Sequence, residues 1–124
     1  MLEEMIINKY SLLGYLSPGR ELYLPLNFAE DFINDCSKNN IAIIGIEFFH
    51  VNNNGITLVV PFSGMDYSDL LKSFSKWEEV VSTCNEKALM ILQKERIQDS
   101  TQFFNPTLFL KKLSNNYICL YSIL

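Results

Sequence analysis

Two apolar stretches separated by a run of asparagines predict a β-hairpin over residues 41–62. The first stretch reads IAIIGIEFFHV, the second reads ITLVVPF, and NNNG stands between them. Asparagine followed by glycine readily adopts the positive φ angles that a two-residue type I′ turn requires. With Asn54 and Gly55 as the loop, Val51 is expected opposite Leu58.

Both faces of the first strand in this hairpin are apolar. Successive side chains of a strand point to opposite faces of its sheet. One face is expected to carry Ile41, Ile43, Phe49, Val51, Leu58, Val60 and Phe62, and the other Ala42, Ile44, Ile46, Phe48 and Val59. A strand that is apolar on both faces is typical of the centre of a sheet, where both faces are covered.

Apolar residues spaced by three and four positions predict helices on both sides of the hairpin. A short helix is expected over residues 2–13. A second helix is expected to begin with Asn27 as its N-cap and to bury Ala29, Phe32, Ile33 and Cys36. Its polar face is expected to point outward, with Glu30, Asp31, Asn34, Asp35 and Lys38.

A third helical pattern continues from Ser68 to Ile97. One uninterrupted helix of that length would be about 45 Å long, at about 1.5 Å per residue. A break is therefore expected near Ser75, where Ser-Lys-Trp-Glu matches a capping box, and the long second piece is expected to end at about Arg96. With only about three and a half heptads and an interrupted seam, this helix is expected to pack on the sheet and not in a coiled coil.

After this helix, Asn105 and Pro106 are expected to break the chain, and the remaining residues predict a second hairpin with strands at 108–110 and 117–124. Together these elements predict an α+β fold. A small, single-layer, mostly antiparallel sheet is expected with helices packed on it, the first hairpin central and the second near the C-terminus. The 124 residues are expected to form one domain, residues 1–124.

Composition excludes several classes of protein. A hydrophobic content of 48% suits a packed core and not a disordered tail. The cysteines at positions 36, 84 and 119 match no zinc or redox spacing, and their odd number argues against a disulfide framework. Glu3 and Glu4 stand where a signal peptide would carry basic residues, and no apolar run approaches the roughly 18 residues of a membrane span. A cytoplasmic protein without a membrane partner is expected.

The net charge of −4 is unevenly distributed. Residues 21–71 contain seven acidic residues against Lys38 alone. An acidic surface repels nucleic acid and attracts basic proteins. The charge pattern therefore favours a basic protein partner and no nucleic acid, and the alternative is a solubilising surface without a partner.

No phosphate-binding loop, nucleophile elbow or zinc spacing is found, so no cofactor or metal is expected. His50 follows Glu47 by three residues, so on a regular strand their side chains leave opposite faces and form no acid–base pair. Glu47 itself stands in an apolar setting, where a carboxylate must be paired, hydrated or at an opening. A structural hydrogen bond, partner recognition and catalysis are the alternatives for it. Gly45 in mid-strand indicates close backbone approach or a bulge.

Residues 16–55 read LSPGRELYLPLNFAEDFINDCSKNNIAIIGIEFFHVNNNG. They combine a proline-containing approach, an amphipathic helix, Ile43-Ile44-Gly45 before a carboxylate and aromatics, and an Asn-Gly turn. This pattern resembles the immunity protein 40 family, small bacterial proteins associated with polymorphic and contact-dependent toxins. The resemblance implies an antidote that binds and blocks its own cell's toxin without catalysis of its own, and it points to Glu47 as a functional residue.

The sequence thus predicts a cytoplasmic immunity protein, not an enzyme, that neutralises the C-terminal domain of a cognate bacterial toxin, expected to be a basic nuclease, through an acidic surface. The expected partner-binding residues are Glu30, Asp31, Asn34, Asp35, Glu47, Asp66, Tyr67 and Asp69. The alternative is a small ligand-binding or enzymatic α+β domain with a pocket at Glu47. A monomer is expected, or a homodimer if the long helix or the last strand forms a self-interface.

Overall fold

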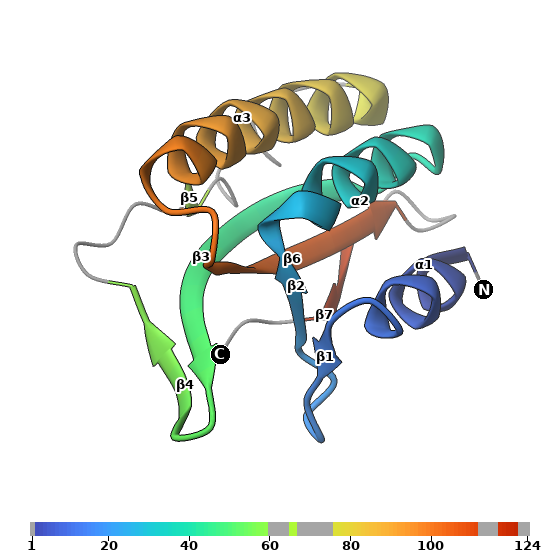
Figure 1. Cartoon of the computed structure of the whole chain (residues 1–124). Coiled ribbons are helices and arrows are strands. Elements are labelled where there is room, and N and C mark those ends of the chain that lie inside the picture. Colours follow the sequence, from blue (N-terminus) through green and yellow to red (C-terminus); the bar gives the residue numbers. More distant parts are fainter. Residues whose placement is uncertain (1, 60–64, 67–75, 112–116, 122–124) are drawn as a thin grey trace.

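The structure, a computed structural model, describes residues 2–59, 65–66, 76–111 and 117–121 (Figure 1). The elements in chain order are α1 (Leu2–Ser11), β1 (Tyr15–Leu16), β2 (Leu22–Pro25), α2 (Leu26–Lys38), β3 (Ala42–Asn52), β4 (Gly55–Leu58), β5 (Met65–Asp66), α3 (Trp77–Gln98), β6 (Phe103–Lys111) and β7 (Tyr117–Tyr121). The predicted α+β class is confirmed. None of the described helices combines the length and the apolar character needed to cross a bilayer.

The strands form an antiparallel, curled sheet in the order β1-β2-β6-β3-β4, with β5 also paired to β3 and β7 also paired to β6 (Figure 1). The two central strands are β3 and β6. The prediction of a central first strand is therefore confirmed. The C-terminal hairpin is also confirmed, because β6 and β7 pair from Lys111 with Tyr117 onward.

The hairpin of β3 and β4 closes one residue earlier than the sequence predicts. Asn52 pairs with Gly55, and Val51 pairs with Ile56 and not with Leu58. A type I′ turn needs positive φ at both loop residues, but within this hairpin only Gly55 has positive φ. The Asn52 side chain explains the difference, because its Oδ1 accepts a hydrogen bond from the Asn54 N–H at 2.8 Å and favours a loop one residue earlier.

A β-bulge interrupts β3 and changes which side chains share a face. The pairing of β3 with β6 shifts between Ile43 and Gly45, as the glycine in mid-strand indicated. After the bulge, Ile46 and Phe48 point into the same core as Ile43. The predicted division of faces is therefore wrong beyond this point, because it assumed regular alternation along the whole strand.

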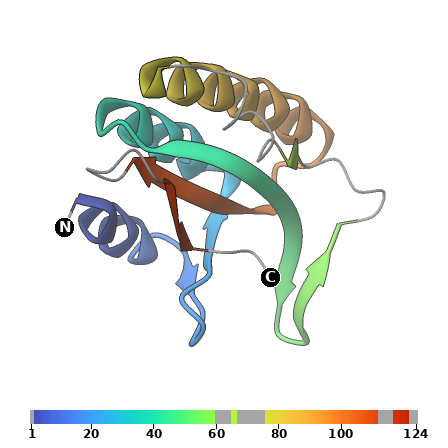
Figure 2. The ribbon, with the colours of Figure 1, turned by 180° about the vertical axis from the view of Figure 1, so that it is seen from behind.

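The main hydrophobic core lies between the sheet and its helices, which cover one face (Figures 1 and 2). The predicted buried residues of α2 are confirmed: Ala29, Phe32, Ile33 and Cys36 are fully buried. The predicted N-cap is wrong, because Pro25 precedes the first turn and Asn27 lies inside the helix. Leu26 is fully buried, so packing starts the helix one residue before the polar residue that the sequence favoured.

The third helix, α3, begins at Trp77 with Lys76 as its N-cap and makes no side-chain cap hydrogen bond. The predicted break at Ser75 and the helix expected before it lie outside the described residues. Trp77 and Cys84 pack against Ala42 and Ile44 of β3. The C-terminal half of α3 contributes to the main core, so the predicted packing on the sheet is confirmed.

Asn105 and Pro106 lie inside β6, so the predicted chain break there is wrong. Proline cannot donate a ladder hydrogen bond. The edge of β6 away from β3 pairs with two different strands. It pairs with β2 as far as Phe104 and with β7 from Leu108 onward, so Pro106 lies between the two partner strands and has no ladder partner there. The Asn105 Nδ2 donates to the Leu22 carbonyl at 2.8 Å and supplies a hydrogen bond to β2 in this gap.

Candidate functional site

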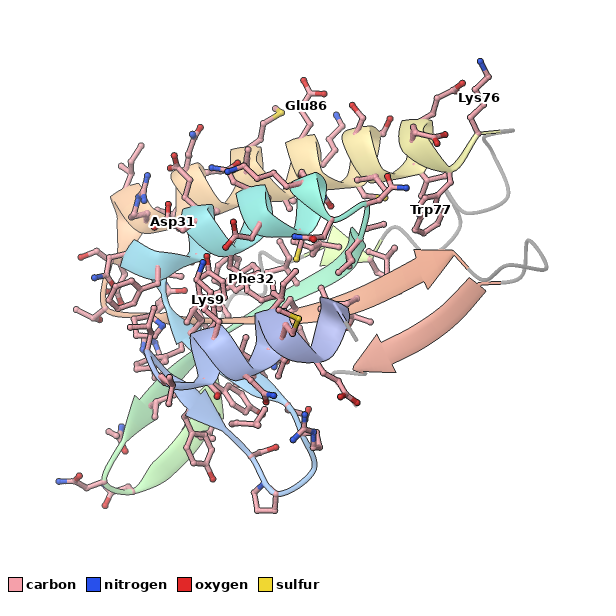
Figure 3. All side chains as sticks on the ribbon, turned by 90° about the vertical axis from the view of Figure 1, so that its right-hand side faces the viewer. Lys9, Asp31, Phe32, Lys76, Trp77 and Glu86 are labelled. Atoms are coloured by element: carbon pink, nitrogen blue, oxygen red, sulfur yellow. The ribbon has the colours of Figure 1, made fainter. Side chains whose placement is uncertain are left out.

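Asp35, one of the predicted partner-binding acids, is hydrogen-bonded to two side chains of α1. Its Oδ2 accepts hydrogen bonds from the Tyr10 hydroxyl at 2.6 Å and from the Lys9 Nζ at 2.9 Å. Figure 3 shows Lys9 on α1 pointing toward α2. These contacts, the Tyr10 hydrogen bond first, lower the pKa of the Asp35 carboxyl. Asp35 therefore ties α1 to α2 and is not an open negative charge.

A second predicted acid is also paired. The Glu30 Oε1 lies 3.4 Å from the Arg96 Nη2, which joins α2 to α3. The other two residues of the predicted α2 face, Asp31 (Figure 3) and Asn34, are exposed. The expectation of an unbroken acidic face on α2 is corrected, since two of its three carboxylates face basic side chains.

Two of the remaining predicted site residues, Asp66 and Glu47, lie on strands and not on α2. Asp66 lies on β5, where it pairs with Gly45 of β3. Tyr67 and Asp69 lie outside the described residues. Glu47 lies on β3 with its side chain on the face of the sheet opposite the main core, because its neighbours Ile46 and Phe48 point into that core. The structure therefore does not bring Glu47 together with the acids of α2.

A groove of about 410 Å³ lies between α2 and α3. It is lined by Ser37, Glu78, Val81, Ser82, Asn85, Glu86 and Leu89. Glu78 and Glu86 are exposed, and neither takes part in an ion pair with any described residue. Figure 3 shows Glu86 on α3 pointing away from the sheet. The sequence did not single out this groove, because its two walls come from helices whose relative placement no local pattern reveals.

Asn85 forms the polar floor of this groove and is 2% exposed. Its Oδ1 accepts from the Ile43 N–H at 2.8 Å, and its Nδ2 donates to the Ile41 carbonyl at 3.0 Å and the Ser37 Oγ at 2.9 Å. Its hydrogen bonds thus go to α2, to β3 and to Ile41 directly before β3. Asn85 holds the groove walls in place, and its own polar atoms are already used.

Glu47 forms part of a second polar cluster, on the sheet face away from the main core. It is half-buried and lies directly opposite Asn105 of β6. Burial raises the pKa of Glu47, and the negative charge of Glu21 adds to the shift. No described residue forms an ion pair with Glu47. Among the described residues, the charged neighbour of this carboxylate is therefore another acid and not a base.

Three aromatic rings lie on the strands that carry or neighbour this cluster. Tyr23 contacts Phe49 edge to face, with ring centroids 5.3 Å apart, and Tyr15 lies 6.1 Å from Tyr23. The pKa of Tyr23 is raised, first by burial and then by the charges of Glu21 and Glu47. Such a surface combines negative charge with aromatic rings, the two features that attract organic cations.

His50 does not complete a catalytic pair with Glu47. Pairing with β6 is regular from Ile46 to Phe49, so the two side chains leave opposite faces as predicted. His50 is exposed and lies near Asp99, whose pKa is lowered chiefly by hydrogen bonds from Thr101. Across the part of the chain that the structure describes, no three His, Cys, Asp or Glu side chains are grouped to hold a metal ion.

No protein-family model, curated protein or solved structure matches the chain. The likeness of residues 16–55 to the immunity protein 40 family therefore stays a prediction from the sequence.

Proposed function

We propose that the protein is a cytoplasmic immunity protein that binds and neutralises a basic toxin domain through the groove between α2 and α3. The observation that carries this proposal is the contrast between two pairs of acids. Glu30 and Asp35 are neutralised by Arg96 and Lys9. Glu78 and Glu86 flank a groove without such partners among the described residues.

The groove suits a basic partner in both charge and shape. Glu78 and Glu86 are eight residues apart on one helix, which separates them by about 12 Å along its axis. Leu89, which is half-buried, provides apolar surface in the same groove, beside the buried Val81. A partner segment with basic side chains at its two ends and an apolar residue between them would match this arrangement. The exposed Asp31 on α2 adds negative charge to the helical layer.

The class of partner follows from electrostatics and from the resemblance. Toxins that act on nucleic acids carry basic surfaces that bind phosphates, and an acidic inhibitor is drawn to such a surface at long range. Opposite potentials raise the association rate and mask the surface that the substrate needs. We infer a nuclease domain as the target on this ground.

The test is protection of bacterial cells. The chain would be produced together with a candidate toxin domain, taken from the C-terminal end of a large secreted protein if the neighbouring gene encodes one. Survival of cells that contain both proteins, and death of cells that contain the toxin domain alone, is the expected result. Death in both cases would reject the immunity function.

Two matched variants test the groove. Glu86→Lys and Glu4→Lys make the same change of charge at exposed helical residues, one in the groove and one on α1. We expect Glu86→Lys to weaken binding of the toxin domain at least about tenfold, equivalent to about 1.4 kcal/mol, and Glu4→Lys to leave it nearly unchanged. Equal effects of the two variants would reject the groove while leaving the function itself intact.

A further inference from the structure

Four side chains form a row across the face of the sheet that points away from the main core. Glu47 on β3 lies opposite Asn105 on β6, and Tyr23 on β2 lies opposite Tyr15 on β1. Since Leu24 pairs with Phe104, antiparallel register places Tyr23 beside Asn105. The row therefore runs Tyr15, Tyr23, Asn105, Glu47 across four neighbouring strands.

Two side chains of the row, Asn105 and Glu47, carry oxygen atoms that accept no hydrogen bond from the described residues. Asn105 is 1% exposed, and its buried Oδ1 has no hydrogen-bond partner in the part of the chain that the structure describes. Its Nδ2 is committed to Leu22 of β2, so the amide oxygen, which diverges from the nitrogen, is directed away from that contact. A buried acceptor without a donor costs roughly 1–3 kcal/mol. Glu47 adds two further acceptor oxygens without a basic partner among the described residues.

We propose that this row is a binding site for a guanidinium group, as carried by an arginine side chain. Guanidinium is planar, bears five N–H donors and has no acceptor, so it can bind the Glu47 carboxylate and the Asn105 Oδ1 together. Its flat face favours contact with aromatic rings. The row offers Tyr23, which is 7% exposed, directly beside Asn105 and the exposed Tyr15 one strand further on. The site lies on the opposite side of the sheet from the groove between α2 and α3, and so goes beyond the proposed function.

Other cations fit the row less well. A calcium ion takes six to eight oxygen ligands, whereas the row and its neighbour Glu21 offer two carboxylates and one amide oxygen beside aromatic rings. An ammonium group is a compact point charge without a plane to stack. The combination of a carboxylate, an unpaired amide oxygen and aromatic faces therefore favours guanidinium over both.

The test is a titration of the whole chain with ethylguanidinium, followed by the NMR signals of the Asn105 side-chain amide and the Glu47 carboxyl carbon. We expect saturable shifts at both groups, and binding at least about fivefold tighter than that of ethylammonium. Glu47→Gln keeps the shape of the side chain and is expected to weaken binding about tenfold. Glu4→Gln makes the same charge change at an exposed residue of α1 and is expected to leave binding unchanged.

Further titrations distinguish the molecules that could carry the guanidinium group and test the competing cations. N-acetylarginine methylamide has no main-chain charges, so its saturable binding supports an arginine side chain within a protein as the ligand. Tighter binding of free arginine supports the amino acid itself as the ligand. Both results support the guanidinium site. Equal binding of ethylguanidinium to the wild type and to a folded Glu47→Gln variant would overturn the proposal. So would ethylammonium binding as tightly as ethylguanidinium, or calcium chloride producing the same shifts.

Discussion

The side-chain amide of Asn85 takes the place of a neighbouring strand beside Ile43. It accepts from the Ile43 N–H at 2.8 Å and donates to the Ile41 carbonyl at 3.0 Å. At this point β3 pairs with β6 on one side, and α3 lies along the other. One helical side chain thus satisfies two backbone groups that an unpaired sheet edge would expose.

Replacing Asn85 by alanine is expected to destabilise the protein strongly. The change leaves the Ile43 N–H and the Ile41 carbonyl buried without partners, at roughly 1–3 kcal/mol each, so a loss of about 3 kcal/mol is expected in urea unfolding. Ser82→Ala, at an exposed position of the same helix, is the control and should change little. A loss below about 1 kcal/mol for Asn85→Ala would show that water replaces the amide at no great cost.

The contact between Tyr10 and Asp35 is expected to make stability depend on acidity. Because the pKa of Asp35 is lowered in the folded state, its contribution is present at neutral pH and is lost as the pH falls through that lowered value. Asp35→Asn should flatten the acid side of the stability curve and cost about 1 kcal/mol at pH 7, since its side chain is 23% exposed and the ion pair is partly screened. Asp31→Asn, on the exposed side of α2, should leave the curve unchanged.

Adding a methyl group at Gly14 is expected to be costly. A Cβ there would collide with the backbone carbonyl of Tyr23 and lie 3.2 Å from both Leu24 and Pro25. Gly14→Ala should therefore lower the free energy of unfolding by about 2 kcal/mol, within the range for overpacking. At Gly19 the nearest atom would be the Ser17 Oγ at 3.8 Å, so Gly19→Ala is the matched control. Similar losses in both variants would mean that backbone freedom, and not this collision, sets the cost.

Salt is expected to slow association with the toxin domain. Attraction between exposed charges is screened over about 10 Å at 0.1 M ionic strength. The association rate of the wild type, measured by stopped-flow mixing, should therefore fall steeply as salt is added. The dependence should be shallower for a variant with both Glu78→Lys and Glu86→Lys. Identical salt slopes would show that attraction is governed by charges elsewhere on the molecule.

Local patterns in the sequence were sufficient for the fold class and for much of the element structure. The spacing of Ala29, Phe32 and Ile33 predicts the buried side of α2, and apolar residues on both faces of β3 predict its central place. The register of the hairpin was missed because it depends on a side-chain contact of Asn52 with the loop. Pro106 favours a chain break by local criteria because no local signal shows that it falls between the partners of β6.

The candidate site was harder to predict because its acidic side chains form ion pairs with residues far away in the sequence. Lys9 is 26 positions from Asp35, and Arg96 is 66 positions from Glu30. No pattern within a single helix reveals such pairs, so the sequence predicts carboxylates without basic partners on the outward face of this helix. The apolar setting of Glu47 did signal a special carboxylate, but its cross-strand neighbour Asn105 follows only from the pairing of β3 with β6.

The bulge in β3 determines the orientation of Glu47. In an uninterrupted strand, Glu47 would share the face of Ile41 and Ile43 and point beneath the helices. The one extra residue near Ile44 shifts the phase of every later side chain, so a hydrophobic residue faces the helices and the carboxylate faces the other way. Chain length at this point is therefore under tighter constraint than residue type, because a shortening by one residue would exchange the interior and exterior of the strand's second half.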